Sequence, residues 1–482
     1  MWSLDEAQAR GVRPHAYRER ETAVTSEAID IRPPARSLSL PLRRTVRPLL
    51  RDPVNTLAGL ARQARGEVVR LNLGPFRPYL VSHPDHVQHV LRGDWENHPR
   101  EGVFWKPVER LAGRSILTEG PDWESSRRIL QPLFTARYVA SLAQDMAETI
   151  DKELTAWEAY AREGRWIDIC EELARLVSRI VIRVLFGDKI SVADAERLAP
   201  AYAIAATSFT SRLLVPFAPE WFPMPGDRAF RRAVEVIDDV VLPLVRQARR
   251  DPGDGNDIIS ALARARADED GPAAERRIRD DLVSIYGASG ETTAVALTWL
   301  WPLLHDHPEV AARLYEEVEI VVGRGPVDAS CLPRLTYLKS VFQEMLRLYP
   351  PGWMMPRMAL RANLLGDVPI EPGSTLLISP YVTQRLEEFW DRPDEFDPER
   401  FAVDRRERRH RYAYFPFGGG PHLCIGQHLF YMEAPLIVAG ILARFRPQVR
   451  APRPLTPFPG ASMRPRETVE VRLEPVAGGA GA

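Results

Sequence analysis

A glycine-rich stretch with a single cysteine, residues 417–426 (FGGGPHLCIG), constrains this 482-residue chain more than any other segment. Its three consecutive glycines let the backbone approach a flat, bulky group without side-chain clash. Cys424 follows at or near the start of a strongly helical segment, Gln427 to Phe445. Unpaired N–H groups and the helix dipole at such a position favour a thiolate, so the stretch predicts a metal ligand.

Cys424 has no neighbouring cysteine. The other two, Cys170 and Cys331, are far away in the sequence, so we predict no disulfide framework and a reducing compartment. Zinc and iron–sulfur sites need several ligands of this kind, whereas haem iron needs only one protein thiolate. The decapeptide alone also allows a buried structural cysteine beside a flexible turn.

The composition is that of a globular protein, with 45% hydrophobic and 27% charged residues. A net charge of −1 and a pI near 6.8 argue against a nucleic-acid binder. The N-terminal residues carry repeated charges without an apolar signal-peptide core, and no run of about 18 apolar residues occurs in the chain. We therefore expect a cytoplasmic protein with no transmembrane segment.

Helical periodicity dominates the chain, and short strand-like pieces cluster near both ends. Residues 1–45 are polar and proline-punctuated, and we expect an irregular N-terminal arm there. Residues 46–482 are predicted to form a single domain, mainly α with a small β portion. Its longest helix is expected at about residues 276–305.

The glycine-rich stretch resembles the haem-binding loop of the cytochrome P450 family, Phe-Gly-x-Gly-x-Arg/His-x-Cys-x-Gly. All fixed positions match: Phe417, Gly418, Gly420, His422, Cys424 and Gly426. The resemblance spans roughly Trp123 to Pro465. It implies the cytochrome P450 fold, an α-helical prism around haem b (iron protoporphyrin IX), with Cys424 as the axial iron ligand.

The long helix carries an unusual cluster of glycine and hydroxyl residues at 285–293 (IYGASGETT). Each mid-helix glycine costs about 1 kcal/mol relative to alanine, so the cluster predicts a kink beside a ligand or close helix packing. Ala288, Glu291 and Thr292 match the family's Ala/Gly-Gly-x-Asp/Glu-Thr motif, although Ser289 replaces its usual glycine. The resemblance implies that Thr292 hydrogen-bonds dioxygen at the iron and that Glu291 supplies protons. The effect of Ser289 on the groove stays open.

Glu344 and Arg347 lie three residues apart on a predicted helix, a spacing that most often gives a solvated surface pair. They match the family's Glu-x-x-Arg motif. With Arg400, in the segment PERF at 398–401, they are implied to form an internal ion-pair triad that holds the loop leading to Cys424.

Trp123 and Arg127 share one helix face at a spacing of four residues, and a guanidinium suits a carboxylate. They match the family's Trp-x-x-x-Arg helix. The resemblance implies that both face the haem propionates, together with Arg357 and His422. Each residue alone would more often be an ordinary surface residue.

Segments that contact substrate in the family correspond to mostly apolar pieces of this chain, and each residue alone is as easily ordinary core. The implied pocket residues are Phe104, Trp105, Phe209, Ala288, Trp353, Met354, Met355, Gly460 and Ala461. They predict a hydrophobic, medium-sized substrate.

A basic run, Arg405 to Arg411, directly precedes the cysteine loop and is either a solvated loop or a docking site for an acidic redox partner. Because no cysteine follows Cys424, we predict no flavin or iron–sulfur segment attached to this chain. We therefore expect NAD(P)H electrons through a separate ferredoxin and ferredoxin reductase, with O2 as the oxygen source.

The sequence thus predicts a haem-thiolate monooxygenase that hydroxylates a hydrophobic small molecule, a terpenoid or polyketide secondary metabolite. The same fold could instead catalyse epoxidation, oxidative coupling, ring formation or peroxide-driven oxidation. Alternatives from other classes are a haem-binding carrier or sensor and a helical scaffold without a cofactor. The intact Glu291–Thr292 pair disfavours the carrier.

Overall fold

The computed structural model describes residues 37–39, 41–208, 221–269, 271–402 and 409–476. The chain divides into two compact units, Met1–Pro33 and Pro34–Ala482, and all described residues belong to the second. Phe209 and the basic segment 403–408 therefore lie outside the described residues.

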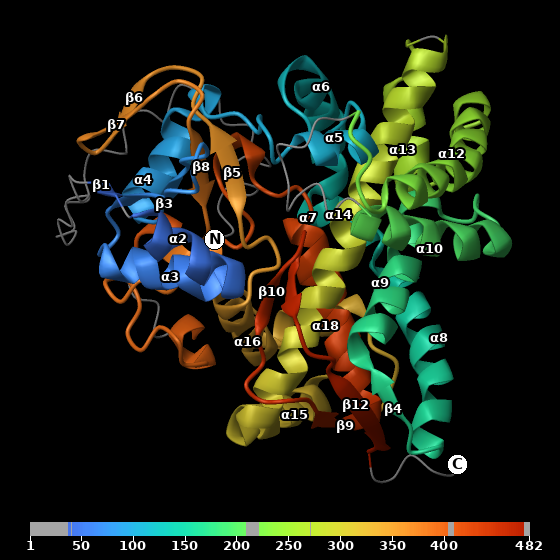
Figure 1. Cartoon of the computed structure of the whole chain (residues 1–482). Coiled ribbons are helices and arrows are strands. Elements are labelled where there is room, and N and C mark those ends of the chain that lie inside the picture. Colours follow the sequence, from blue (N-terminus) through green and yellow to red (C-terminus); the bar gives the residue numbers. More distant parts are fainter. Residues whose placement is uncertain (1–36, 40, 209–220, 270, 403–408, 477–482) are drawn as a thin grey trace, which may run out of the picture. The chain divides into compact units, whose positions relative to one another are not determined.

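Helices make up most of this unit (Figure 1). The described α-helices are α2 (Leu42–Arg51), α3 (Pro53–Gln63), α4 (Pro84–Gln88), α5 (Lys106–Ala112), α6 (Gly120–Leu130), α7 (Ala136–Ser141), α8 (Ala143–Arg162), α9 (Ile169–Phe186), α10 (Val192–Ser208), α12 (Asp227–Arg250), α13 (Ile258–Ala265), α14 (Gly271–Asp306), α15 (Pro308–Val321), α16 (Thr336–Leu348), α17 (Pro380–Thr383) and α18 (Gln427–Arg444). Short 3-10 turns join them: η3 (Trp95–Asn97), η4 (Gln131–Phe134), η5 (Ala329–Arg334), η6 (Pro398–Phe401), η8 (Arg411–Ala413) and η9 (Gly420–His422). A π turn, η2 (His89–Gly93), extends α4.

The core forms around α14, which runs through the helical part beside α9, α16 and α18 (Figure 1). Most α14 side chains from Ile278 to Leu304 are buried, as are most of those of α18 from Leu429 to Ala443. The buried stretch of α18 is apolar on every side apart from Glu433, as expected for a helix inside a protein. The predicted long helix at 276–305 is confirmed, with slightly wider bounds.

The strands form small sheets on the other side of the unit and at its C-terminal end. The five-stranded sheet has the order β1 (Ser37–Ser39), β2 (Val68–Arg70), β3 (Tyr79–Val81), β8 (Thr375–Ile378) and β5 (Met355–Met358). A three-stranded sheet has the order β4 (Trp166–Asp168), β12 (Glu470–Pro475) and β9 (Phe445–Arg450). Two further sheets have two strands each: β6 (Asn363–Leu365) with β7 (Val368–Ile370), and β10 (Pro457–Pro459) with β11 (Met463–Pro465).

The pairing in the large sheet brings distant segments together. β3 lies parallel to β8, with Leu80 opposite Leu377, and β8 lies antiparallel to β5, with Leu376 opposite Arg357. The predicted class, mainly α with a small β portion, is confirmed. The expected irregular arm differs at its end, because β1 pairs in parallel with β2 and α2 begins at Leu42.

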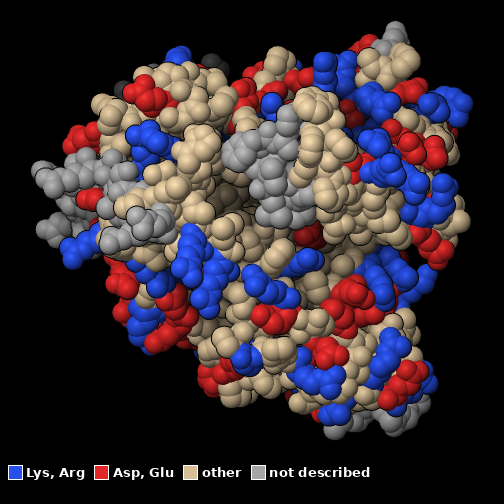
Figure 2. All heavy atoms as spheres, in the orientation of Figure 1, with Lys and Arg blue, Asp and Glu red and all other residues tan. Residues whose placement is uncertain are grey.

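One described helical segment, Gly420–Arg444, is long and apolar enough to cross a membrane by length and composition alone. Since 67% of it is buried inside the protein, core packing accounts for its apolar character. Basic and acidic side chains are interspersed on the face drawn in Figure 2, and basic ones gather most over α12 and α13.

Candidate active site

The glycine loop is shaped by contacts with the protein itself. Gly418 and Gly420 have φ angles of +75° and +66°, which side chains other than glycine rarely adopt. A Cβ on Gly420 would lie 1.8 Å from the carbonyl oxygen of Leu91, and one on Gly419 would lie 2.4 Å from the ring of Tyr412. These two glycines therefore let the loop pack against η2 and the Tyr412 ring.

Cys424 lies three residues before α18, with Gly426 at the helix cap. Its N–H donates to the carbonyl oxygen of Phe417 at 2.9 Å, which fixes the turn. The thiol is accessible but lies deep in the protein, and burial raises the pKa of Cys424, while the backbone N–H of Gly426 and the charge of Arg127 oppose the rise. The N–H at the helix start thus favours the thiolate, as expected, but in the free protein burial outweighs it. A bound metal ion would deprotonate such a thiol.

The α14 segment facing the accessible region is the cluster singled out from the sequence. Gly287 and Ala288 are exposed between the buried stretches 278–286 and 293–304 of α14, at the place where the family resemblance implies a groove in this helix. The Thr292 hydroxyl donates to the carbonyl oxygen of Ala288 at 2.7 Å, and the Ser289 hydroxyl donates to that of Ile285. Such bonds to the residue four positions earlier bend helices and favour a local distortion here. Burial raises the pKa of Glu291, so this acid can hold and release a proton closer to neutral pH.

The predicted cations lie near the cysteine loop. On α6, Trp123 is buried and Arg127 donates to the carbonyl oxygen of Leu423 at 2.8 Å. On β5, Arg357 is 5% exposed, and its guanidinium donates to the adjacent carbonyl oxygen of Pro356 at 2.8 Å. Burial and the neighbouring Arg100 lower the pKa of Arg357 to about 9, so it stays mostly charged at neutral pH.

Two charged residues that the sequence reasoning did not single out join this group. Glu119 accepts hydrogen bonds from the backbone N–H and Nε of Arg100, both at 2.9 Å. The same carboxylate lies 3.0 Å from Nε2 of His422, whose ring stacks on Trp123 at 4.3 Å between centroids. Glu119 directly precedes Gly120, the first residue of α6. No motif in its local sequence predicts its contacts with Arg100 and His422.

The charges of this group fit a haem with two propionates. Glu119 compensates Arg100, whereas Arg357 has no carboxylate within ion-pair distance among the described residues. A buried cation without an ion-pair partner is costly, so an anion bound beside Arg357 would stabilise the site. Together, Cys424 could hold iron, Arg357 and Arg127 could hold carboxylates, and the α14 groove could hold a small molecule beside the iron.

The predicted ion-pair triad is buried and fully formed. Glu344 and Arg347 are both 0% exposed and joined by two hydrogen bonds of 2.7 and 2.8 Å, and Nε of Arg400 lies 3.3 Å from Glu344. Arg347 also donates to the carbonyl oxygen of Gln384 at 3.0 Å, and the Gln384 side chain accepts from the N–H of Phe415 at 2.9 Å. Gln384, which the sequence reasoning missed, therefore links the triad to the start of the cysteine loop.

The structure brings two pairs of predicted pocket segments together. Nε1 of Trp353 donates to the carbonyl oxygen of Gly460 at 3.1 Å, which joins the segment before β5 to the β10–β11 turn. Nε1 of Trp105 donates to the carbonyl oxygen of Pro356 at 3.1 Å, beside Met355 on β5. Phe104, Trp353 and Met354 pack against one apolar cluster, which includes Leu377 and Met463.

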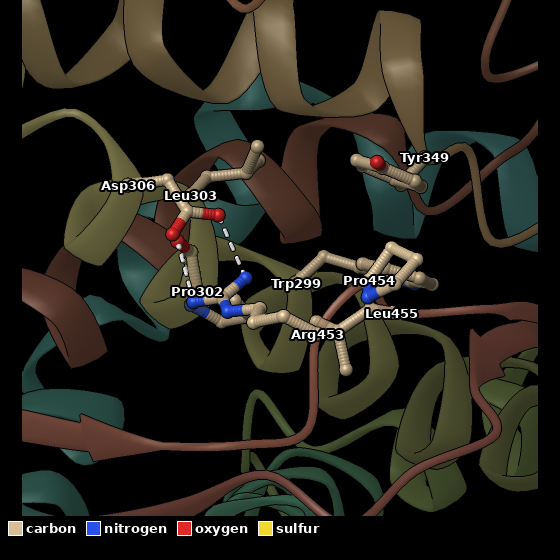
Figure 3. Close-up of a pocket in the computed structure, with 8 residues that line it drawn as sticks. All are labelled: Trp299, Pro302, Leu303, Asp306, Tyr349, Arg453, Pro454 and Leu455. Atoms are coloured by element: carbon tan, nitrogen blue, oxygen red, sulfur yellow. Dashed lines mark hydrogen bonds and ion pairs between the residues drawn. The ribbon is translucent and has the colours of Figure 1, made fainter.

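A separate pocket of about 530 Å³ lies at the C-terminal end of α14 (Figure 3). Trp299 and Tyr349 stack there at 3.9 Å, and Arg453 forms an ion pair with Asp306 at 2.7 Å. Its lining shares no residue with the predicted haem, oxygen or substrate sets. The pocket is therefore distinct from the candidate active site.

Comparison with known proteins identifies the class. The cytochrome P450 family model matches residues 50–472, so the chain belongs to the cytochrome P450 family and is a cytochrome P450 monooxygenase. Membership in this family implies the use of haem iron and O2.

Among curated relatives, the chain is 34% identical to a cyclooctatin synthase of Streptomyces melanosporofaciens, covering 91% of this chain and 93% of the relative. It is 34% identical to a cyclooctat-9-en-7-ol 5-monooxygenase of the same organism, covering 88% and 90%. A pentalenene oxygenase of Streptomyces avermitilis is 29% identical, with 88% and 93% covered.

Solved structures agree on the fold. The haem domain of cytochrome P450DA has a TM-score of 0.80 and 24% identity, covering 92% of this chain and 98% of that one. A six-coordinated cytochrome P450 from Thermus thermophilus has a TM-score of 0.66 and 27% identity, covering 88% and 99%.

Proposed function

We propose that this chain hydroxylates a terpenoid, with Cys424 as the axial ligand of a haem and Thr292 and Glu291 as the catalytic pair. The observation that carries the proposal is the combination of an accessible thiol in the cysteine loop, an exposed turn within the buried part of α14, and a buried cation without a carboxylate partner among the described residues. The substrate class is supported by the relatives, which are bacterial terpenoid monooxygenases.

When bound, the haem would supply the oxygen-activating chemistry, with thiolate donation favouring O–O cleavage. The protein's residues hold and prepare the site. Arg357, Arg127 and His422 would bind the propionates, and the triad with Gln384 would keep the loop in place. Trp123 packs beside His422.

Proton delivery is assigned to α14. Because the Thr292 hydroxyl donates its proton to the carbonyl of Ala288, its oxygen lone pairs remain available to a donor in the groove. Glu291, with its raised pKa, would replenish protons. Ala288 is exposed in the same groove and would contact substrate, together with Trp353, Met355 and Gly460.

We further propose that a separate ferredoxin and ferredoxin reductase deliver NAD(P)H electrons in the cytoplasm. The arginine-rich run preceding the cysteine loop supports an acidic partner.

The test replaces the thiol while preserving its size. Cys424→Ser should abolish the red-shifted absorbance band of the reduced carbon-monoxide complex, whereas Cys170→Ser, the matched control, should keep it. Wild-type protein with partner proteins should convert cyclic terpenes to products one oxygen atom heavier. A band that survives in Cys424→Ser would contradict the proposed ligand, and turnover with peroxide alone would favour the peroxide-driven alternative.

A further inference from the structure

Arg100 and His422 form a group with the carboxylate of Glu119. This carboxylate lies where the two haem propionates are also expected. Glu119 is held by two bonds from Arg100 and one contact from His422, and only 15% of its side chain is exposed. Burial alone would raise the pKa of Glu119, but the hydrogen bond to His422 and the charge of Arg100 outweigh it and lower the pKa to about 2, so the carboxylate is charged throughout the physiological range. The negative charge next to the cation group is therefore permanent.

This carboxylate divides the surrounding cations into two kinds. Nε and Nη2 of Arg100 are already engaged, since Nε donates to Glu119 and Nη2 donates to the carbonyl oxygens of Ile116 and Thr118 at 3.1 and 2.6 Å. Nε2 of His422 is likewise occupied by Glu119, so only Nδ1 of its ring is left for another partner. Arg357 keeps its charge without a carboxylate partner among the described residues.

From these contacts, and resting on the haem proposed above, we infer that Glu119 is a positioning residue of the propionate side. It cancels the charge of Arg100, fixes the orientation of the His422 ring and leaves Arg357 and Arg127 as the positive charges for the propionates. Glu119 thereby sets the net charge beside the haem. Nothing in its local sequence distinguishes it from a surface acid.

Charge this close to the haem affects how easily the iron is reduced, because reduction adds one negative charge. Loss of the Glu119 charge favours reduction, and loss of the Arg100 charge opposes it. If Glu119 served only packing, Glu119→Gln and Arg100→Gln would not shift the reduction potential in opposite directions.

The experiment measures the reduction potential of haem-loaded protein by spectroelectrochemistry. Glu119→Gln is expected to shift the potential in the positive direction and Arg100→Gln in the negative direction. The double variant should return close to wild type, and Glu119→Asp, which keeps the charge, should stay near it. Glu124→Gln is the matched control, because it removes the same charge from an exposed position on α6 and should leave the potential almost unchanged.

The outcomes separate this inference from the proposed function. Equal shifts in Glu119→Gln and Glu124→Gln, or shifts of the same sign in Glu119→Gln and Arg100→Gln, overturn the role of Glu119. If those results come with an intact red-shifted carbon-monoxide band, the haem-thiolate function stands. A wild-type protein without the band overturns both proposals. Opposite shifts that cancel in the double variant, with the band retained, support both.

Discussion

At the scale of single residues, the role proposed for a threonine depends on whether its hydroxyl oxygen is open to solvent or buried. The hydroxyls of Thr292 and Thr298 both donate to the carbonyl four residues earlier on α14, at 2.7 and 2.8 Å. Thr292 lies beside the exposed Gly287–Ala288 opening, whereas Thr298 is buried. The same local hydrogen bond therefore leaves the hydroxyl oxygen accessible to a ligand at Thr292 and enclosed at Thr298.

Thr292→Ala should lower the yield of oxygenated product per NAD(P)H consumed by roughly tenfold or more, because the positioned hydroxyl is lost. NAD(P)H consumption should continue, with its electrons diverted to reduced oxygen species. Product and cofactor are measured in the same reaction. Thr298→Ala deletes the same group about 9 Å further along the helix and should leave the yield nearly unchanged. An equal loss in both variants would assign the effect to helix stability.

At the scale of elements, the triad decides how the cysteine loop is held. Sequence spacing favoured a solvated pair for Glu344 and Arg347, but the helix α16 carries them into the interior. There, Asp397 N–H and the carbonyls of Gln384, Pro393 and Glu395 complete the hydrogen bonds. Buried pairs are retained only with such partners.

Glu344→Gln should therefore lower the free energy of unfolding by about 3–5 kcal/mol, since Arg347 would remain as an uncompensated buried charge. Denaturant unfolding measures this change. Arg450→Gln breaks the exposed Arg450–Glu470 pair on the β9–β12 sheet and should cost less than about 1 kcal/mol. Similar costs for the two variants would show that burial of the triad contributes little.

A second element, the segment from His83 to His89 that contains α4 and the start of η2, has buried histidine ring nitrogens without hydrogen-bond partners among the described residues. Both ring nitrogens of His86 and Nε2 of His83 and of His89 have none among the described residues. Burial, with smaller effects of His83 and His89, lowers the pKa of His86 to about 4, while Asp85 opposes the shift. Asp85 also contacts His410 at 3.1 Å, from the segment before η8.

This depressed pKa predicts acid sensitivity. The unfolded state takes up a proton below about pH 6.5 and the folded state only near pH 4, so stability is present above pH 6.5 and is lost as the pH falls between these values. His86 should make the protein about 2 kcal/mol less stable at pH 5 than at pH 7. His86→Leu should remove this part of the pH dependence in denaturant unfolding, and His305→Leu, at an exposed position, should not. An unchanged pH dependence in His86→Leu would contradict the prediction.

At the scale of the whole molecule, the chain has a net charge of −1 but an arginine-rich segment beside its cysteine loop. If charge steers an acidic partner to this segment, salt will screen the attraction. The rate of electron transfer to the protein should then fall by roughly tenfold as the salt concentration rises from low to high. Stopped-flow reduction by ferredoxin measures the rate. Arg411→Glu should slow it at low salt, whereas Arg361→Glu, exposed next to β6, should not. A salt-independent rate would contradict docking through charge.

The sequence by itself determined the family and the fold class, and it indicated the residues to which roles are assigned by local motifs. The decapeptide ending in Gly426, the Glu291–Thr292 pair on a long helix and the Glu344–Arg347 pair can each be recognised within a few residues. Apolar periodicity also placed the long helix within a few residues of α14. Such features are local because helix geometry brings residues three or four apart onto one face.

Only the tertiary structure decided which residues surround that local chemistry. Glu119 and His422 are 303 residues apart, and Gln384 and Phe415 are 31 apart, so no periodic pattern announces either contact. The same holds for the glycines of the cysteine loop, whose close neighbours are Leu91 and Tyr412. Contacts of this kind depend on how helices and sheets pack, and packing also decides which charges are buried and therefore need partners.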